Sequence, residues 1–141
     1  MALRIEDYAL IGDTQSAALV GRDGSIDWAC LPRFDSGACF AALVGTRDNG
    51  RWAIQPEGPF RPAGRRYRPG TMVLETDFEA DEGAMSVIDF MPVRGDAPRI
   101  VRIVEGRRGT VDVRSELIRR QLQGSLVPEG ARVEVQYVDP T

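Results

Sequence analysis

Carboxylates are the side chains of this sequence that could do acid–base chemistry. The 141 residues include 21 Asp and Glu, and hydrolysis of a glycosidic bond needs two carboxylates that flank the scissile bond. Histidine and lysine are absent, so all 18 basic residues are arginine. Their absence excludes a Ser-His-Asp triad, a Schiff-base lysine and the lysine of a phosphate-binding loop. The number of acidic residues therefore suggests glycoside hydrolysis as one hypothesis, which their positions have to support.

Most of the carboxylates fall at alternate positions of predicted strands, where they would face solvent. They are Glu75, Asp77, Glu79, Asp112, Glu116 and Glu134. Asp27, expected to point outward beside Trp28, and Asp35 have the best claim to a site. A turn-stabilising or domain-contact role is favoured over catalysis for both. Asp89 lies within an apolar strand, so we expect it to be buried and paired, with an arginine as the candidate partner.

Two further groups of side chains could bind a ligand. Four aromatic residues could form a stacking platform for sugar rings: Trp28, Phe34, Trp52 and Tyr67. For Trp28 and Trp52 a role in the core is favoured, because aromatic side chains dominate core energetics. Four arginines could bind phosphate or a carboxylate-bearing surface, and a solvated loop is favoured: Arg61, Arg65, Arg66 and Arg68. Cys30 and Cys39 do not have zinc-site spacing, so we expect buried thiols, with a disulfide as the alternative, and no metal or cofactor.

These side chains are positioned by predicted β-strands, in which apolar and polar residues alternate with a period of two. Alternating or β-branched runs occur at residues 51–56, 71–80, 83–92, 99–106, 110–118 and 131–138. Met72, Leu74, Thr76 and Phe78 would share one apolar face. Turn signals recur about every ten residues, as in an antiparallel β-sandwich. The prediction is an all-β sandwich with at most one or two short helical turns, the helical candidate being Ala38–Val44.

The connections between these runs are also predicted. Residues 81–83 would close one hairpin, and residues 106–109 would make a tight turn between the strands 99–106 and 110–118. The Pro- and Arg-rich stretch 58–70 predicts an irregular loop or edge connection. Asp23-Gly24 predicts a hairpin turn, and Ile26 and Trp28 would form the apolar face of the strand that follows it.

Length and charge limit the function classes. One domain spanning residues 1–141 is expected from the length. The net charge of −3 does not favour a nucleic-acid partner. No run reaches the roughly 18 apolar residues of a membrane span, and the first ten residues lack the apolar core of a signal peptide. We therefore expect a cytoplasmic protein that binds neither nucleic acid nor membrane.

Several blocks of the sequence occur in the order found in one known family. They are IEDYALIGD (5–13), DGSIDW (23–28), LPRFDSGACFAALVG (31–45), RRYRPGTMVLET (65–76) and VIDFMPVRG (87–95). Over roughly the first 118 residues the chain resembles the N-terminal β-sandwich domain of bacterial glycoside hydrolase family 15 proteins, of the glucoamylase and trehalase type. After Leu117 the sequence departs from the family pattern, and it reads RRQLQGSLVPEG over 119–130.

The resemblance implies a non-catalytic domain. In that family the catalytic glutamates lie in a separate helical barrel, which the chain is too short to include, so no catalytic residue transfers to it. The loop of the PRFDS type faces the barrel in related proteins. The resemblance therefore implies Pro32, Arg33, Phe34, Asp35 and Ser36 as candidates for a domain contact, and Trp28 is added as a sugar-facing candidate because of its aromatic ring.

Three functions stay open at this point. The first is a structural module that supports and docks an α-glucoside-hydrolysing barrel, with an exposed docking face through which the chain could self-associate. The second is an independent carbohydrate-binding or scaffolding sandwich that binds an α-glucoside. The third and least favoured is a minimal enzyme.

Overall fold

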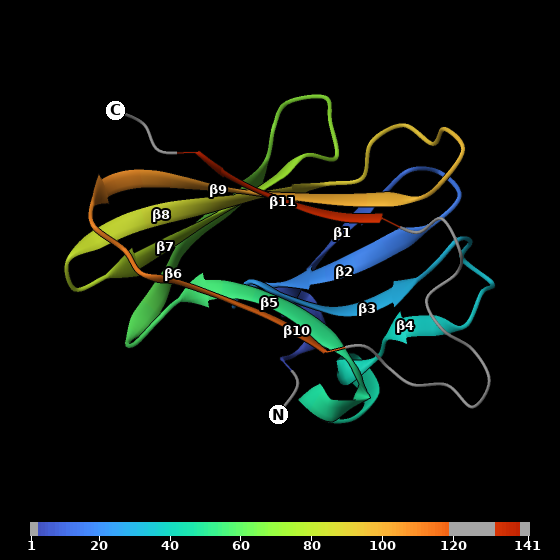
Figure 1. The fold of residues 1–141 in the computed structure, drawn as a ribbon, viewed down its shortest axis with the longest axis horizontal. Helices are drawn as coiled ribbons and strands as arrows, with labels where there is room; N and C mark the ends of the chain where they lie inside the picture. The colour runs from blue at the N-terminus through green and yellow to red at the C-terminus, as the bar shows by residue number, and fades with distance from the viewer. Residues whose placement is uncertain (1–2, 119–131, 139–141) are drawn as a thin grey trace.

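The structure, a computed structural model, describes residues 3–118 and the backbone of residues 132–138. Within these residues two β-sheets pack face to face (Figure 1). Sheet A has the strand order β1 (Tyr8–Gly12), β2 (Ala17–Gly21), β3 (Ser25–Cys30), β5 (Arg51–Pro56), β10 (Val113–Ile118), with β4 (Ala38–Phe40) paired to β3. Sheet B has the order β11 (Arg132–Val138), β9 (Arg99–Gly109), β8 (Gly83–Phe90), β7 (Leu74–Ala80), β6 (Phe60–Tyr67). The predicted all-β sandwich is confirmed.

Several local predictions are also confirmed. The strand at 51–56 is β5, and Asp23-Gly24 closes the hairpin between β2 and β3, with Gly24 at a φ of 85° that favours glycine. The turn after Ala80 joins β7 to β8 as an antiparallel hairpin. Helical structure is limited, within the described residues, to three-residue 3-10 turns: η1 (Ile5–Asp7), η2 (Ala42–Val44) and η3 (Arg47–Asn49).

Two segments have a different structure from the one predicted. The helical candidate Ala38–Val44 is split, because Ala38–Phe40 pairs with β3 as β4 and only Ala42–Val44 is helical. The stretch 58–70 is not irregular, since eight of its residues form the edge strand β6. Prolines are tolerated there because an edge strand needs backbone donors on one side only, and the pairing with β7 skips one residue between Pro62 and Gly64.

The predicted tight turn at 106–109 is wrong. β9 continues through Gly109, which pairs with Gly83 of β8. The chain then crosses to sheet A, where β10 pairs antiparallel with β5 from Val113↔Pro56 to Ile118↔Arg51. A period of two shows that a segment is a strand but not which sheet it joins.

The C-terminal strand also departs from the predicted arrangement in part. The strand expected at 131–138 is β11, but it pairs with β9 in parallel, in a sandwich that is otherwise antiparallel. The side chains of β11, including Glu134, and all of residues 119–131 lie outside the described residues.

The prediction that Ile26 and Trp28 share one face of β3 is wrong, because the strand contains a β-bulge. Val20 pairs with Ile26 and Leu19 pairs with Trp28, so Asp27 is the extra residue on the bulged strand. As a result Ile26 packs in the main core, whereas Trp28 packs against a separate small cluster. Asp27 is not outward: it is 5% exposed and accepts hydrogen bonds from the hydroxyls of Tyr8 and Ser25.

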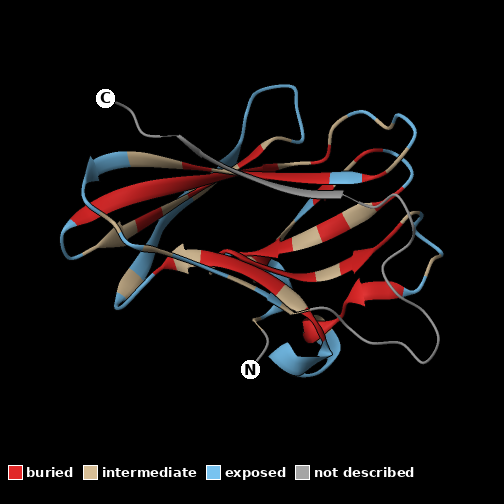
Figure 2. Ribbon diagram, in the orientation of Figure 1, coloured by how far each residue is buried: buried red, intermediate tan, exposed pale blue. Residues whose placement is uncertain are grey.

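The main core lies between the two sheets. Figure 2 shows buried residues along the facing strands and exposed residues in the loops at both ends. Leu74, Thr76 and Phe78 share the inner face of β7 as predicted, but Met72 lies exposed in the turn before that strand. Cys39 packs in this core, and Cys30 packs in the small cluster beside Trp28.

A buried ion pair joins the two sheets through this core. Asp89 of β8 is fully buried and pairs with Arg102 of β9, whose Nε lies 2.7 Å from Oδ1 of Asp89. The other two nitrogens of the Arg102 guanidinium bond to sheet A and one of its turns. Nη1 donates to the carbonyl of Trp52 in β5, and Nη2 donates to that of Gly24 between β2 and β3, each at 2.6 Å. The guanidinium also lies 5.0 Å from the centre of the Trp52 ring, within range of a cation–π interaction. The predicted burial and arginine pairing of Asp89 are confirmed.

We expect Arg102→Lys to lower the free energy of unfolding by roughly 2–4 kcal/mol. A single ammonium group cannot satisfy Asp89 and the two buried carbonyls together. Arg99→Lys on the same strand is the matched control, because Arg99 is exposed. Urea unfolding followed by tryptophan fluorescence measures both variants. Equal stability of the two would show that the arginine fork does not hold the sheets.

Candidate functional site

Three loops meet at one end of the sandwich. Residues 13–16 join β1 to β2, residues 31–37 join β3 to β4, and residues 91–98 join β8 to β9, and all three lie on the right of Figure 1. Five of the six candidate residues, Pro32–Ser36, belong to the second loop. The neighbouring loops determine how that loop is held.

Asp13 and Arg94 tie the three loops together. The buried carboxylate of Asp13 accepts from the backbone N–H groups of Gln15 at 3.0 Å and Ser16 at 2.8 Å. Arg94 reaches it from the β8–β9 loop, with Nε 2.7 Å from Oδ2 of Asp13. Nη2 of Arg94 also donates to the carbonyl of Pro32 at 2.5 Å. We call this arrangement the Asp13–Arg94 clasp.

Burial by itself would raise the pKa of Asp13. The hydrogen bonds from Arg94 and from the two backbone N–H groups, together with the arginine charge, outweigh this effect and lower the pKa. Asp13 is therefore held as a carboxylate, which is the form that the clasp requires.

The loop that carries Pro32–Ser36 is held by hydrogen bonds of its own backbone as well as by the clasp. The peptide bond between Leu31 and Pro32 is cis. The N–H of Phe34 donates to the carbonyl of Gln15 at 3.0 Å, and the N–H of Ser36 donates to that of Arg33 at 3.0 Å. Ser36 Oγ accepts from the N–H of Arg33 at 3.1 Å. The loop is therefore a closed turn with a defined outward face.

The outward face of this turn combines one apolar and two charged side chains. The Phe34 side chain projects outward and is 60% exposed. Arg33 and Asp35 form a bidentate pair beside it, at 3.1 Å from Nε to Oδ1 and 3.0 Å from Nη2 to Oδ2. Hydrogen bonding from Arg33 lowers the pKa of Asp35. The turn thus presents an aromatic ring next to a preformed ion pair, with Pro32 and Ser36 half-buried at its base.

The sixth candidate does not share this loop. Trp28 is half-buried on β3 and packs against the cluster of Cys30, Ala38 and Ala41. Of the other aromatic candidates, Trp52 is 1% exposed and belongs to the core, so it cannot stack on a sugar. Tyr67 is half-exposed, and its hydroxyl donates to the carbonyl of Leu10 at 2.7 Å.

The arginine cluster of β6 is largely engaged within the protein. Arg66 and Arg68 pair with Glu75 of β7, and Arg66 also pairs with Asp77. Arg65 bridges to sheet A, where Nη1 donates to the carbonyls of Asp7 at 2.8 Å and Val20 at 3.2 Å. These contacts favour a structural role over an anion site. The bonds of Arg65 and Tyr67 join the β6 edge to η1, β1 and β2.

Sequence reasoning did not find Asp13 or Arg94. Asp13 is followed by Ser16 in the pattern of a side-chain-capped turn, so it could have been identified as a turn residue. Arg94 carries no local signal, because its partners Asp13 and Pro32 lie 81 and 62 residues away in the chain.

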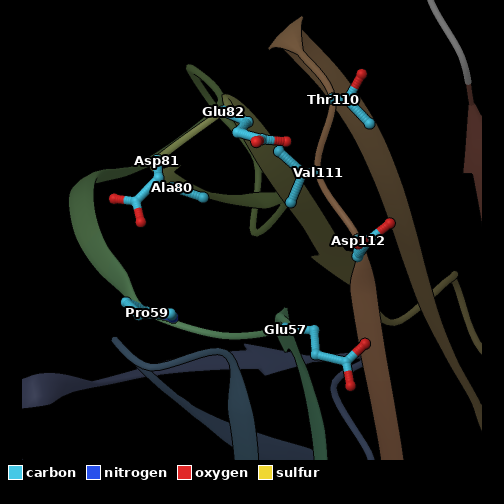
Figure 3. Close-up of a pocket in the computed structure, with 8 residues that line it drawn as sticks. All are labelled: Glu57, Pro59, Ala80, Asp81, Glu82, Thr110, Val111 and Asp112. Carbon is cyan, nitrogen blue, oxygen red and sulfur yellow. The ribbon is translucent and has the colours of Figure 1, made fainter.

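The opposite end of the sandwich has a shallow acidic hollow of about 190 Å³. It is lined by Glu57, Pro59, Ala80, Asp81, Glu82, Thr110, Val111 and Asp112 (Figure 3). None of these side chains is aromatic, and the four carboxylate residues are exposed. Figure 3 shows Asp81 directed away from Glu57 and Asp112. Within the described residues no group of three or more His, Cys, Asp or Glu side chains could hold a metal ion.

Comparisons with known proteins identify the family. Residues 1–135 match the family described as "Trehalase-like, N-terminal". The chain belongs to this family. A trehalase of Mycolicibacterium smegmatis is 38% identical over 85 residues, which are 60% of this chain and 13% of that protein. Trehalase 2 of Sulfolobus acidocaldarius is 33% identical over 101 residues, 72% of this chain and 16% of that protein.

A third relative, a trehalase of Thermoplasma volcanium, is 31% identical over 116 residues. The match covers 78% of this chain and 19% of that relative. The matched segments thus span less than a fifth of the length of these relatives. No solved structure matches it. In the described part of the chain no helix is long and apolar enough to cross a membrane.

We expect Asp13→Asn to lower the free energy of unfolding by roughly 1–3 kcal/mol at neutral pH, because a neutral amide weakens the clasp. Since the folded pKa is lowered, this contribution is present above the ordinary Asp value of about 3.9 and is lost as pH falls through the lowered pKa. The difference in the free energy of unfolding between wild type and Asp13→Asn should therefore disappear at acidic pH. Urea unfolding at a series of pH values measures it.

Asp35→Asn is the control for this prediction, because Asp35 also pairs with an arginine but is exposed. It should leave stability unchanged at every pH. The role given to the Asp13 charge would be contradicted if the two proteins differed in free energy of unfolding by the same amount down to strongly acidic pH.

Proposed function

We propose that this chain is the non-catalytic N-terminal domain of a glycoside hydrolase of the glucoamylase and trehalase type, family 15. It supports and docks a separate helical barrel that hydrolyses an α-glucoside. The observation that carries the proposal is the family match over residues 1–135, combined with relatives that bear the name trehalase and are more than five times longer than the matched segment.

The placement of the carboxylates supports a non-catalytic role. A glycosidase needs an acid and a second carboxylate directed at one bond. Several acidic residues in the described chain are instead bound by arginines: Glu116 by Arg51, Glu79 by Arg108, and Glu75 by Arg66 and Arg68. The acidic hollow has no aromatic wall on which a sugar could stack.

The closed turn at Pro32–Ser36 is the proposed contact with the barrel. An exposed aromatic ring held on a fixed loop loses little conformational entropy when it is buried by a partner. Phe34 would provide the apolar contact, and Arg33 with Asp35 would provide polar contacts around it. The same face could mediate self-association when the barrel is absent.

A carbohydrate-binding module is the second candidate, and the exposure of Phe34 is the observation that favours it. It is the weaker candidate because Trp52 is in the core and Trp28 is half-buried against a cluster. The low cysteine count is compatible with the cytoplasmic location predicted above, which stays a prediction.

We expect the isolated chain to show no turnover of trehalose or maltose. A hybrid in which the chain replaces the matching segment of the Mycolicibacterium smegmatis trehalase should hydrolyse trehalose, because the docked domain supports the barrel. Glucose release measures both, with the unaltered trehalase and the same trehalase lacking the segment as controls.

Three results would overturn parts of the proposal. Turnover by the isolated chain would contradict the non-catalytic assignment. A hybrid no more active than the trehalase lacking the segment would contradict the supporting role. Saturable binding of maltose or trehalose to the isolated chain, measured by calorimetry, would favour the carbohydrate-binding module.

A further inference from the structure

We infer that the β8–β9 loop around Val93 is a second half of the docking surface and that it is buried together with Phe34 against the barrel. The inference rests on the proposed function and extends it to a segment that neither the sequence analysis nor the comparisons assign. Its occupant is the remainder of a trehalase-like polypeptide.

Val93 is the most exposed large apolar side chain in the described part of the chain, at 95%. It follows Pro92 and precedes Arg94 and Gly95, in a loop where turn residues are ordinarily small or polar. Nothing in the packing of the sandwich requires an apolar residue there, because the core contact of this loop is made by Met91. A single exposed valine is common on protein surfaces, so the inference depends on the position of Val93 beside the clasp and not on its exposure alone.

The clasp joins the two loops that carry Val93 and Phe34. Arg94 is the residue next to Val93, and its guanidinium binds Asp13 and the carbonyl of Pro32, two residues before Phe34. The Arg94 side chain is 10% exposed, so this bond is shielded from solvent. The two loops therefore have a fixed relative position before any partner arrives, which lowers the entropic cost of docking.

The composition of this end fits a protein partner. Phe34 and Val93 would provide a small apolar centre, and the exposed pair of Arg33 and Asp35 would provide a polar rim. The opposite end is acidic around Glu57 and Asp112 and offers no such centre. The two ends of the sandwich thus differ: one exposes apolar side chains beside an ion pair, and the other exposes carboxylates.

The choice of occupant follows from length. The segments of the chain that match correspond to 13% of one trehalase, 16% of a second and 19% of a third. At least four-fifths of each relative therefore lies outside the matched segment, and a domain of this size must attach to that remainder. A surface of two neighbouring loops suits a contact within one polypeptide, where a short connection raises the effective concentration of the partner.

Amide hydrogen exchange in the hybrid described above tests the inference against the isolated chain. We expect peptides covering 31–37 and 91–98 to exchange at least about tenfold more slowly in the hybrid, since burial against the barrel suppresses local opening. Peptides covering 57–59 and 80–82, at the acidic end, should exchange at the same rate in both proteins.

The variant Val93→Asp in the hybrid should abolish most of the added protection of both loops, because a charge would be buried at the contact. Val44→Asp is the matched control: Val44 is also exposed, at 75%, but lies on η2 away from the clasp. Both substitutions are at exposed positions, and the isolated chain carrying either should unfold at the same urea concentration as wild type.

Each outcome decides between the two proposals. Protection of 31–37 without protection of 91–98, or equal effects of Val93→Asp and Val44→Asp, would overturn the inference and leave the proposed function standing. Protection of neither loop, or protection of the acidic end instead, would overturn the inference and also the proposed contact at Pro32–Ser36. Protection of both loops that Val93→Asp removes would support the inference.

Discussion

The sandwich depends on one arginine that is bonded to both of its sheets. Arg102 extends from β9 into a region with no access to water, where its charge is neutralised by Asp89 and its remaining donors satisfy backbone carbonyls of sheet A. Bonds of this kind are directional, unlike apolar packing, so they fix how the sheets are placed relative to one another. The apolar core packs between the two sheets that this arginine joins.

The Asp13–Arg94 clasp repeats the same chemistry at the end of the molecule. In both cases a guanidinium binds a carboxylate and also a backbone carbonyl of a segment far away in the chain. A chain without lysine is suited to this, since only arginine has the planar fork that serves several acceptors at once. Stability and the proposed docking surface are therefore built from one type of interaction.

Local sequence patterns predicted the strands and the hairpin turns well, because alternation and Asp-Gly signals report on the nearest residues only. They failed where long-range pairing decides the outcome. Asp27 turned inward because of a bulge against β2, Ala38–Phe40 became a strand because β3 offers a free edge there, and β10 joined sheet A. The candidate loop Pro32–Ser36 was found through a family resemblance. Its supports Asp13 and Arg94 were not, because the fold alone brings them together.

The join between β6 and β1 affects how this domain can meet other chains. Arg65 and Tyr67 donate to backbone carbonyls near the outer margin of sheet A, and β6 itself carries prolines and a bulge. A carbonyl that already accepts a hydrogen bond from one of these side chains is less able to pair with a strand of another chain. Recruitment along this flank by strand addition, a common route to aggregation and to peptide capture, is therefore disfavoured.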